Sequence, residues 1–353
     1  MSAPPLLLVD GDNALHRAYH VMVDLQTSTG LRVGGVTGML SIVRWLVRDY
    51  PDHVVVVVWD GGRSDRRKRA CPTYKQGRVQ KEYHLDGLFT IEQQQGLTWD
   101  LFSRMGICQV LLSGVEADDV VAILSRAAQR SIIYSTDKDF LQLVRPGHSC
   151  YRRLSGDDEE QDGRSGRGRV VDDDNFATHC RVYRQRRNGE PPRDLYVSHP
   201  HVFRLALAAA GDSSDNVPGI RGTGWSSAVE FFEYLYRLRP HDLRPEKTNL
   251  DLVYEQARCS DSRRVRRIAD DWEDYLTCLS VVDLWRDDLL SDAQVSELRG
   301  HLDAHRPVYN RERVIDFLVG WEFEDALEWE SATHSAMTSR RLDLRSDDME
   351  FRS

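Results

Sequence analysis

The sequence predicts an α/β fold: a central, mostly parallel sheet flanked by helices, with a helical C-terminal region. Short apolar runs alternate with segments whose apolar residues recur at helical spacing, which is the pattern of consecutive βαβ units. The clearest run is Val54 to Val58, five valines in succession. A continuous β-branched run is typical of a strand buried on both faces, as in parallel sheets covered by helices.

Residues 1–150 hold the predicted α/β core. Strands are expected at 6–9, 54–58, 107–112 and 132–134. Helices are expected at 35–50 and 98–105, and a third has Glu116, Asp118 and Asp119 in its first turn and apolar spacing from Val120. Three strands are followed by an aspartate: Asp10, Asp60 and Asp137. Because ligands of open α/β sheets bind outside the carboxyl ends of the strands, we expect these three side chains to face one site.

A second group of acidic residues lies in the stretch 114–141. Glu116, Asp118 and Asp119 come at the start of a helical pattern, and Asp137 and Asp139 follow a strand. In a βαβ unit the start of such a helix and the end of such a strand lie at one edge of the sheet, so these carboxylates should meet. Mg²⁺ or Mn²⁺ commonly holds such a cluster ionised. The alternative is that the helix dipole alone stabilises the first-turn acids.

Basic residues concentrate between positions 61 and 95, where apolar periodicity lapses. They are Arg63, Arg66, Arg67, Lys68, Arg69, Lys75, Arg78 and Lys81. The segment is expected to hold phosphates over the acidic face, and its interleaved Tyr74 and Tyr83 are suited to stacking on bases. The alternative is a solvated charged loop.

The second half of the chain is predicted to be mainly helical. Residues 151–197 are predicted to form a polar, partly flexible insertion, in which 181–193 is exposed. A helix at 198–210, capped by Ser198, is expected after the insertion. Residues 263–267 contain four arginines, typical of a solvated helix face, and 291–353 read as a late helix at 313–321 and a polar tail.

The loop between 211 and 224 combines acids with glycines. Asp212 and Asp215 stand in it, and three glycines precede a helix that begins near Trp225: Gly219, Gly222 and Gly224. Glycines before a helix N-terminus let backbone N–H groups approach a phosphate. The alternative is an ordinary helix-to-helix turn.

Composition restricts the class of protein. The chain has 353 residues, 41% of them hydrophobic, enough for one large globular domain or two. Its formal charge of −9 argues against a protein that merely coats nucleic acid, since non-specific binding depends on basic contacts to phosphate. The six cysteines show no zinc-site spacing and indicate reduced thiols in the cytoplasm. No apolar run has membrane-spanning length, so neither an anchor nor a signal peptide is expected.

The chain resembles the 5′ nuclease superfamily, which comprises flap endonucleases and 5′ to 3′ exonucleases, in six short motifs that occur in the same order. They are VDGDN at 9–13, WDGG at 59–62, YKQGR at 74–78, GVEADD at 114–119, STDKDF at 135–140 and GDSSDNVPGI at 211–220. SVVDLW at 280–285 is similar to the family's C-terminal helical segment. The chain length and the long insertion resemble free-standing phage members more than cellular ones.

The resemblance implies a nuclease core with a helical arch at about 61–95, and a helix-three-turn-helix region at 198–290. It implies two divalent cations, Mg²⁺ or Mn²⁺: one held by Asp10, Asp60, Glu116, Asp118 and Asp119, and one by Asp137, Asp139, Asp212 and Asp215. Lys75 and Arg78 match a catalytic basic pair at the foot of the arch. The resemblance implies that Arg67, Tyr74, Gly219, Gly222 and Gly224 bind DNA. It also implies a K⁺ ion at the 219–224 loop.

The function implied is metal-dependent hydrolysis of DNA phosphodiester bonds, as a 5′ to 3′ exonuclease, a 5′-flap endonuclease or both, in replication, repair or RNA-primer removal. The expected partner is DNA with a 5′ end, flap or nick, or an RNA–DNA hybrid. The protein is expected to act as a monomer in the cytoplasm, or in the host's cytoplasm if a phage encodes it. One alternative is a nuclease acting mainly on RNA. The other is a non-catalytic, structure-specific DNA-binding protein, against which the complete set of carboxylates argues.

Three features depart from the family pattern. Trp225 and Ser226 stand where a proline or lysine is common before the second helix, so DNA binding by this motif is expected to differ from that of the family. YKQGR replaces the commoner YKANR but keeps both charges. The segment 155–194 is longer than expected.

Overall fold

A six-stranded sheet forms the centre of the molecule, which is a computed structural model describing residues 4–76, 90–152, 169–185 and 193–338, with Leu344, Ser346, Met349 and Phe351. The strand order is β3-β2-β1-β4-β5-β6. All neighbouring strands pair in parallel except β5 and β6, which are antiparallel. The strands are β1 (Leu6–Asp10), β2 (Val54–Trp59), β3 (Cys108–Leu111), β4 (Ser131–Tyr134), β5 (His148–Arg152) and β6 (Arg169–Val171). The predicted sheet is confirmed.

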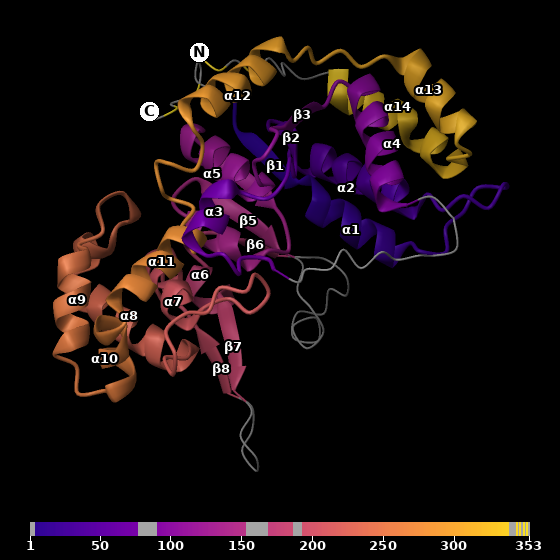
Figure 1. Cartoon of the computed structure of the whole chain (residues 1–353). Helices are drawn as coiled ribbons and strands as arrows, with labels where there is room; N and C mark the ends of the chain where they lie inside the picture. The colour runs from indigo at the N-terminus through magenta and orange to yellow at the C-terminus, as the bar shows by residue number, and fades with distance from the viewer. Residues whose placement is uncertain are drawn as a thin grey trace.

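Helices cover both faces of this sheet (Figure 1). On one face α1, α2 and α4 pack against one another, and on the other α5 packs against β1, β2 and β4. The change of face follows from the strand order: the chain moves outward from β1 to β3 and then returns to β4, and right-handed crossovers in opposite directions place their helices on opposite faces. The helices are α1 (Gly11–Val21), α2 (Gly34–Asp49), α4 (Ile91–Arg104) and α5 (Ala117–Ala127).

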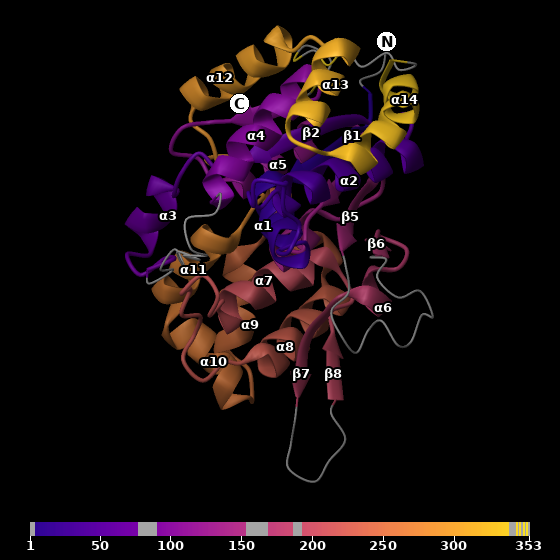
Figure 2. The same ribbon diagram turned by 90° about the vertical axis from the view of Figure 1, so that its right-hand side faces the viewer.

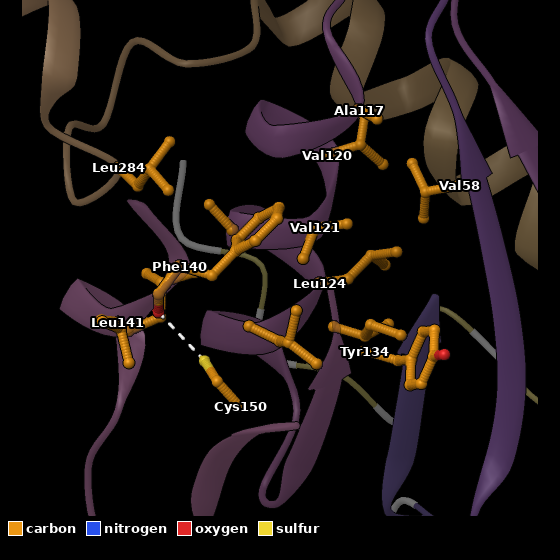
Figure 3. Packing of buried hydrophobic residues seen from close by; sticks show 14 of the residues in the cluster. Val58, Ala117, Val120, Val121, Leu124, Tyr134, Phe140, Leu141, Cys150 and Leu284 are labelled. Atoms are coloured by element: carbon orange, nitrogen blue, oxygen red, sulfur yellow. Dashed lines mark hydrogen bonds between the residues drawn. The ribbon is translucent and has the colours of Figure 1, made fainter. Parts of the chain in front are cut away.

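Burial of its apolar face determines how α5 lies. Val121 and Leu124 lie between Val58 of β2 and Phe140, which follows β4 (Figure 3). All four side chains are almost completely buried. With this face turned to the core, the first turn of α5 lies at the carboxyl ends of the strands.

The second half of the chain forms two helical groups on either side of the sheet (Figures 1 and 2). One comprises α7 (Pro200–Ala210), α8 (Trp225–Leu238), α9 (Leu250–Arg258), α10 (Arg263–Asp270) and α11 (Trp272–Val282). The other comprises α12 (Asp292–Ala304), α13 (Arg311–Gly320) and α14 (Glu324–Thr338), and packs on α2 and α4. The first group contacts the core through α3 (Asp65–Ala70) and the 3₁₀ helix Lys138–Leu143.

Four local predictions need correction. No helix was predicted directly after the first strand, but α1 begins there at Gly11, and Ala14, Leu15, Ala18 and Tyr19 form its buried face. Thr90 caps α4, which starts at Ile91 and not near residue 98. His199, not Ser198, caps α7, since Ser198 instead hydrogen-bonds Glu233. The late helix starts at 311 rather than 313, and α14 occupies 324–338, most of which was expected to be polar tail.

Parts of the insertion and of the predicted arch are described. The insertion contains β6, α6 (Phe176–His179) and an antiparallel hairpin of β7 (Arg181–Gln185) and β8 (Arg193–Tyr196), where the sequence indicated only exposure. The predicted flexibility of 151–197 remains untested, and arch residues 77–89, including Arg78, lie outside the described residues. Within the described residues, none of the helices combines the length and apolarity needed to span a bilayer.

Candidate active site

The carboxyl ends of β1, β2 and β4 meet at one edge of the sheet. Asp10 ends β1, and its Oδ2 accepts a hydrogen bond of 2.8 Å from Oγ of Ser135, which follows β4. Asp60 follows β2, and its Oδ1 accepts a hydrogen bond of 2.7 Å from the backbone N–H of Ala117, the first residue of α5. Three strand ends and one helix N-terminus are thereby joined, as the sequence predicted.

The first turn of α5 presents three carboxylates to one arginine. Arg67 lies on α3 and is 1% exposed. Its Nη1 donates to Asp118 Oδ1 at 2.9 Å and also contacts Glu116, and its Nη2 donates to Asp119 Oδ1 at 2.7 Å. This ion-pair cluster keeps the three acids together.

Lys75 and Tyr74 connect this group to the loop between α7 and α8. The ammonium of Lys75 lies 3.1 Å from Glu116 Oε1 and 3.9 Å from Asp215 Oδ2, and its backbone N–H donates to the Asp215 carbonyl at 2.8 Å. Tyr74 donates its hydroxyl hydrogen to Glu116 Oε2 at 2.8 Å. Lys75 has a φ of 49°, in the left-handed region that non-glycine residues seldom adopt.

The second acidic group comes from the turn after β4 and from the α7–α8 loop. Asp137 caps the 3₁₀ helix, accepting a hydrogen bond of 2.9 Å from the N–H of Asp139. Lys138 Nζ donates to Asp212 Oδ2 at 2.5 Å and lies 4.0 Å from Asp139 Oδ1. That oxygen is buried and has no hydrogen-bond partner among the described residues.

Both acidic groups line the same small cavity. Asp118 belongs to the first group and Asp139, Asp212 and Asp215 to the second, and all four face this cavity together with Arg67 and Tyr74. The structure therefore brings together carboxylates that stand almost a hundred residues apart in the sequence.

Crowding and burial raise the pKa of several of these carboxyls. Desolvation raises the pKa of Asp10 well above its ordinary value, and the charges of Asp60 and Asp137 add to the effect. Desolvation likewise raises the pKa of Asp139 well above its ordinary value, with further contributions from Asp137, Asp212 and Asp215. Desolvation and the neighbouring acids raise the pKa of Asp60 to about 6.

The pKa values of two acids in the first turn of α5 shift in opposite directions. Desolvation raises the pKa of Asp119 to about 7, even though Arg67 opposes the shift. For Asp118, desolvation acts in the same direction, but Arg67 and Lys75 outweigh it and hold the pKa below its ordinary value.

The donor set fits a hard divalent cation. Its groups are carboxylate oxygens, which Mg²⁺ and Mn²⁺ prefer, and one of them, Asp139 Oδ1, accepts no hydrogen bond from any residue that the structure describes. Within the described residues, however, no three His, Cys, Asp or Glu side chains surround a common point as a ready-made metal cage. The physical reason is that Arg67, Lys75 and Lys138 lie between the acids and bond to them.

Two residues that were predicted to bind DNA lie in the interior of the protein and not on its surface. Arg67 and Tyr74 are both buried, 1% and 4% exposed, and their polar groups face the acidic cluster. Burial removes their side chains from the surface open to DNA.

Sequence reasoning missed two polar residues of the site. Lys138 stands between two predicted ligands, and Asp12 accepts a hydrogen bond of 2.6 Å from the N–H of Asp60. Their position inside the motifs VDGDN and STDKDF was the available signal.

The glycine loop contacts α10. Gly219 has a φ of 62° and Gly222 a φ of 83°, which suit glycine, and Gly224 caps α8 without a side-chain hydrogen bond. Thr223 donates its hydroxyl hydrogen to the Arg264 carbonyl at 2.6 Å, and Arg267 donates to the Arg221 carbonyl at 2.9 Å. Tight glycine turns and the N-terminus of α8, which no described side chain caps, thus lie beside a basic helix.

The sheet whose carboxyl-end edge gathers acids from three strands, one helix and a distant loop lies in the part of the chain that matches a 5′ nuclease family. Residues 5–176 match the family described as the 5′-3′ exonuclease, N-terminal resolvase-like domain.

Individual relatives agree with this assignment. DNA polymerase I of Pseudomonas aeruginosa is 30% identical over 233 residues, 65% of this chain but only 22% of the polymerase. The 5′-3′ exonuclease of Buchnera aphidicola is 24% identical over 64% of this chain and 68% of its own. A structure of the bacteriophage T5 flap endonuclease in complex with DNA and metal ions shares the fold, with a TM-score of 0.56 and 17% identity over 89% of this chain and 98% of that one.

Proposed function

We propose that the chain is a divalent-metal-dependent hydrolase that cleaves DNA phosphodiester bonds near a 5′ end, as an exonuclease, a flap endonuclease or both. The observation that carries this proposal is the meeting of two acidic groups at one cavity beside Lys75 and Lys138. The names of the relatives support it, and so do the DNA and metal ions in the T5 complex. For this activity we propose a role in replication, repair or RNA-primer removal.

Nine carboxylates would hold two Mg²⁺ or Mn²⁺ ions. Asp10, Asp60, Glu116, Asp118 and Asp119 are proposed for one ion, and Asp137, Asp139, Asp212 and Asp215 for the other. When bound, such ions activate a water and stabilise the oxygen that leaves. The all-oxygen donor set favours hard cations over zinc.

The protein's own cations have separate roles at this site. The side chain of Lys75 is 14% exposed beside Glu116, so its ammonium can meet a phosphate while its backbone N–H remains bonded to the α7–α8 loop. Charge fixed beforehand where negative charge accumulates lowers the barrier to the reaction. Arg78 is proposed as its partner from the motif. Lys138 orients Asp212 through their hydrogen bond.

Duplex DNA is proposed to lie along the loop 219–224 and α10. Arg221, Arg263 and Arg264 are exposed there, and the N-terminus of α8 has no acidic residue in its first turn. Such a surface suits backbone phosphate and can act locally in a chain whose net charge is −9. A K⁺ ion held by the loop's carbonyls, and action by a monomer, belong to the same proposal.

The test is incubation of a labelled 5′-flap duplex with Mg²⁺ or with EDTA. Wild-type protein should release short products bearing a 5′ phosphate only with Mg²⁺. Asp137→Asn should abolish cleavage, and Asp251→Asn, an exposed aspartate on α9, should not. Binding without cleavage in Mg²⁺ would overturn the enzyme proposal. Parallel RNA–DNA hybrid and single-stranded RNA substrates distinguish a nuclease that acts mainly on RNA.

A further inference from the structure

We propose that Arg67 is an internal counter-ion and positioning residue, which shares Glu116, Asp118 and Asp119 with the metal site and limits how strongly they attract a divalent cation. This inference rests on the proposed metal-dependent function and adds a role for a residue that the family motifs placed on the DNA. It predicts that metal affinity and stability respond differently to the charge and to the shape of the side chain at position 67.

The first support is the geometry of the guanidinium. Nη1 and Nη2 donate to Asp118 at 2.9 Å and to Asp119 at 2.7 Å, and Nη1 also contacts Glu116. The side chains of Arg67, Glu116 and Asp119 are only 1–3% exposed. One planar fork therefore fixes three carboxylates that a single helical turn would otherwise hold in mutual repulsion.

The second support is the attachment of Arg67 on its other side. Its Nε donates to the Val281 carbonyl at 3.0 Å, and Arg66 donates to the Ser280 carbonyl at 2.5 Å. These carbonyls lie in the last turn of α11, where a helix leaves its acceptors unpaired. The guanidinium is thus held between the acids of α5 and the end of α11, so it is not free to swing into solvent.

Charge then determines the effect on metal binding. A fixed positive charge inside the acidic group lowers the negative potential that a divalent cation experiences. Removing that charge should strengthen metal binding, while leaving the buried acids unpaired and the metal-free protein less stable. Lysine would keep the charge but lose the planar fork, which separates the two effects.

The experiment compares thermal unfolding in EDTA and across a Mn²⁺ titration for wild type, Arg67→Gln, Arg67→Lys and the control Arg69→Gln. Arg69 lies on the same helix but is exposed, and bonds only the Asp65 carbonyl among the contacts described. In EDTA both Arg67 variants should melt ~5 °C or more below wild type.

Metal affinity should separate the two Arg67 variants. Arg67→Gln should bind Mn²⁺ roughly tenfold more tightly than wild type, because a charge close to the site is lost. Arg67→Lys and Arg69→Gln should stay within about twofold of wild type, since both keep the charge at position 67. If Arg67→Gln does not fold in EDTA, Arg66→Gln provides the same test, because Arg66 lies 3.6 Å from Asp119 and its loss should strengthen Mn²⁺ binding by roughly twofold.

Two outcomes would overturn the inference: a glutamine variant that loses the same stability with and without Mn²⁺, or a lysine variant whose Mn²⁺ affinity matches that of the glutamine variant. The first result would mean that Arg67 stabilises the fold and does not affect metal binding. Failure of the proposed function looks different, since wild-type protein would then show neither a Mn²⁺-dependent rise in melting temperature nor cleavage.

Discussion

Asp139 is the residue at which stability and the proposed chemistry conflict most directly. One of its carboxylate oxygens is buried without a hydrogen-bond partner among the described residues, and desolvation together with three neighbouring aspartates raises its pKa. The Lys138 ammonium lies 4.0 Å from this oxygen and offsets its charge only in part, and a buried carboxylate that lacks a hydrogen bond destabilises a fold. Its retention is understandable if a cation completes its coordination.

Asp139→Asn should therefore separate stability from activity. Without metal, its melting temperature should equal or exceed that of wild type by a few degrees (~2 °C), because the buried negative charge is removed. Cleavage in Mg²⁺ should fall by ~100-fold or more. Differential scanning calorimetry in EDTA and the flap assay measure the two effects. A variant that cleaves at the wild-type rate would remove Asp139 from the metal site.

At the scale of elements, the loop between α7 and α8 depends on backbone conformations that only glycine adopts easily. Gly219 has a positive φ, and a Cβ atom there would lie 2.4 Å from the backbone nitrogen of Gly211. Gly224 has a φ of −93° and nothing within 4 Å of a Cβ. The two glycines thus form a matched pair within one loop.

Gly219→Ala should lower the free energy of unfolding by more than ~1 kcal/mol, because the loop must rearrange to admit the methyl group. Gly224→Ala should change it by less than ~1 kcal/mol. Urea unfolding of both variants measures the difference. Equal losses would mean that the loop does not require the left-handed conformation at 219.

The basic face of α10 should contribute affinity for DNA and not chemistry. Replacing both Arg263 and Arg264 by Gln should weaken duplex binding and reduce the slope of log affinity against log salt by about 2, since each phosphate contact contributes about 1. The cleavage rate at saturating DNA should not change. Fluorescence anisotropy at several KCl concentrations tests this, with Arg258→Gln on α9 as the control. An unchanged slope would place the duplex elsewhere.

For the molecule as a whole, the acidic site should link pH, metal and stability. The pKa values of Asp60 and Asp119 are raised from 3.8 to about 6 and about 7 in the folded state. Between about pH 4 and 7 the folded chain thus binds more protons at these groups than the unfolded chain, so their contribution to stability falls as pH rises through this window.

Because a divalent cation needs the ionised carboxylates, Mg²⁺ should offset this loss mainly at higher pH. The rise in melting temperature caused by Mg²⁺ should be clearly larger at pH 8 than at pH 5.5. Comparing melting temperatures with Mg²⁺ and with EDTA at each pH cancels the titration of unrelated groups. An equal rise at both values would contradict a metal bound by these acids.

Local patterns were sufficient for the elements that carry strong periodicity. The valine run of β2 and the apolar spacing of α5 appear in the structure within one or two residues of their predicted positions. Helix α1 was missed because Gly11, Asp12 and Asn13 resemble a turn when read alone. In the structure Asp10 caps a helix there, and its side chain accepts a hydrogen bond from the backbone N–H of Asn13. A cap and a turn use the same residue types, and only the packing of the helix that follows distinguishes them.

Short motifs and strand ends were enough to predict the sheet, the acids at its carboxyl edge and the resemblance to 5′ nucleases, because sheet topology brings the ends of parallel strands to one edge. Three features followed only from the packing of distant segments: Arg67 and Tyr74 turn inward, Lys138 bonds Asp212, and one Asp139 oxygen accepts no hydrogen bond within the described parts of the chain. The reason is that the direction and the partner of a charged side chain depend on neighbours from distant segments, here α3, α5, α11 and the α7–α8 loop, whose approach no local pattern records.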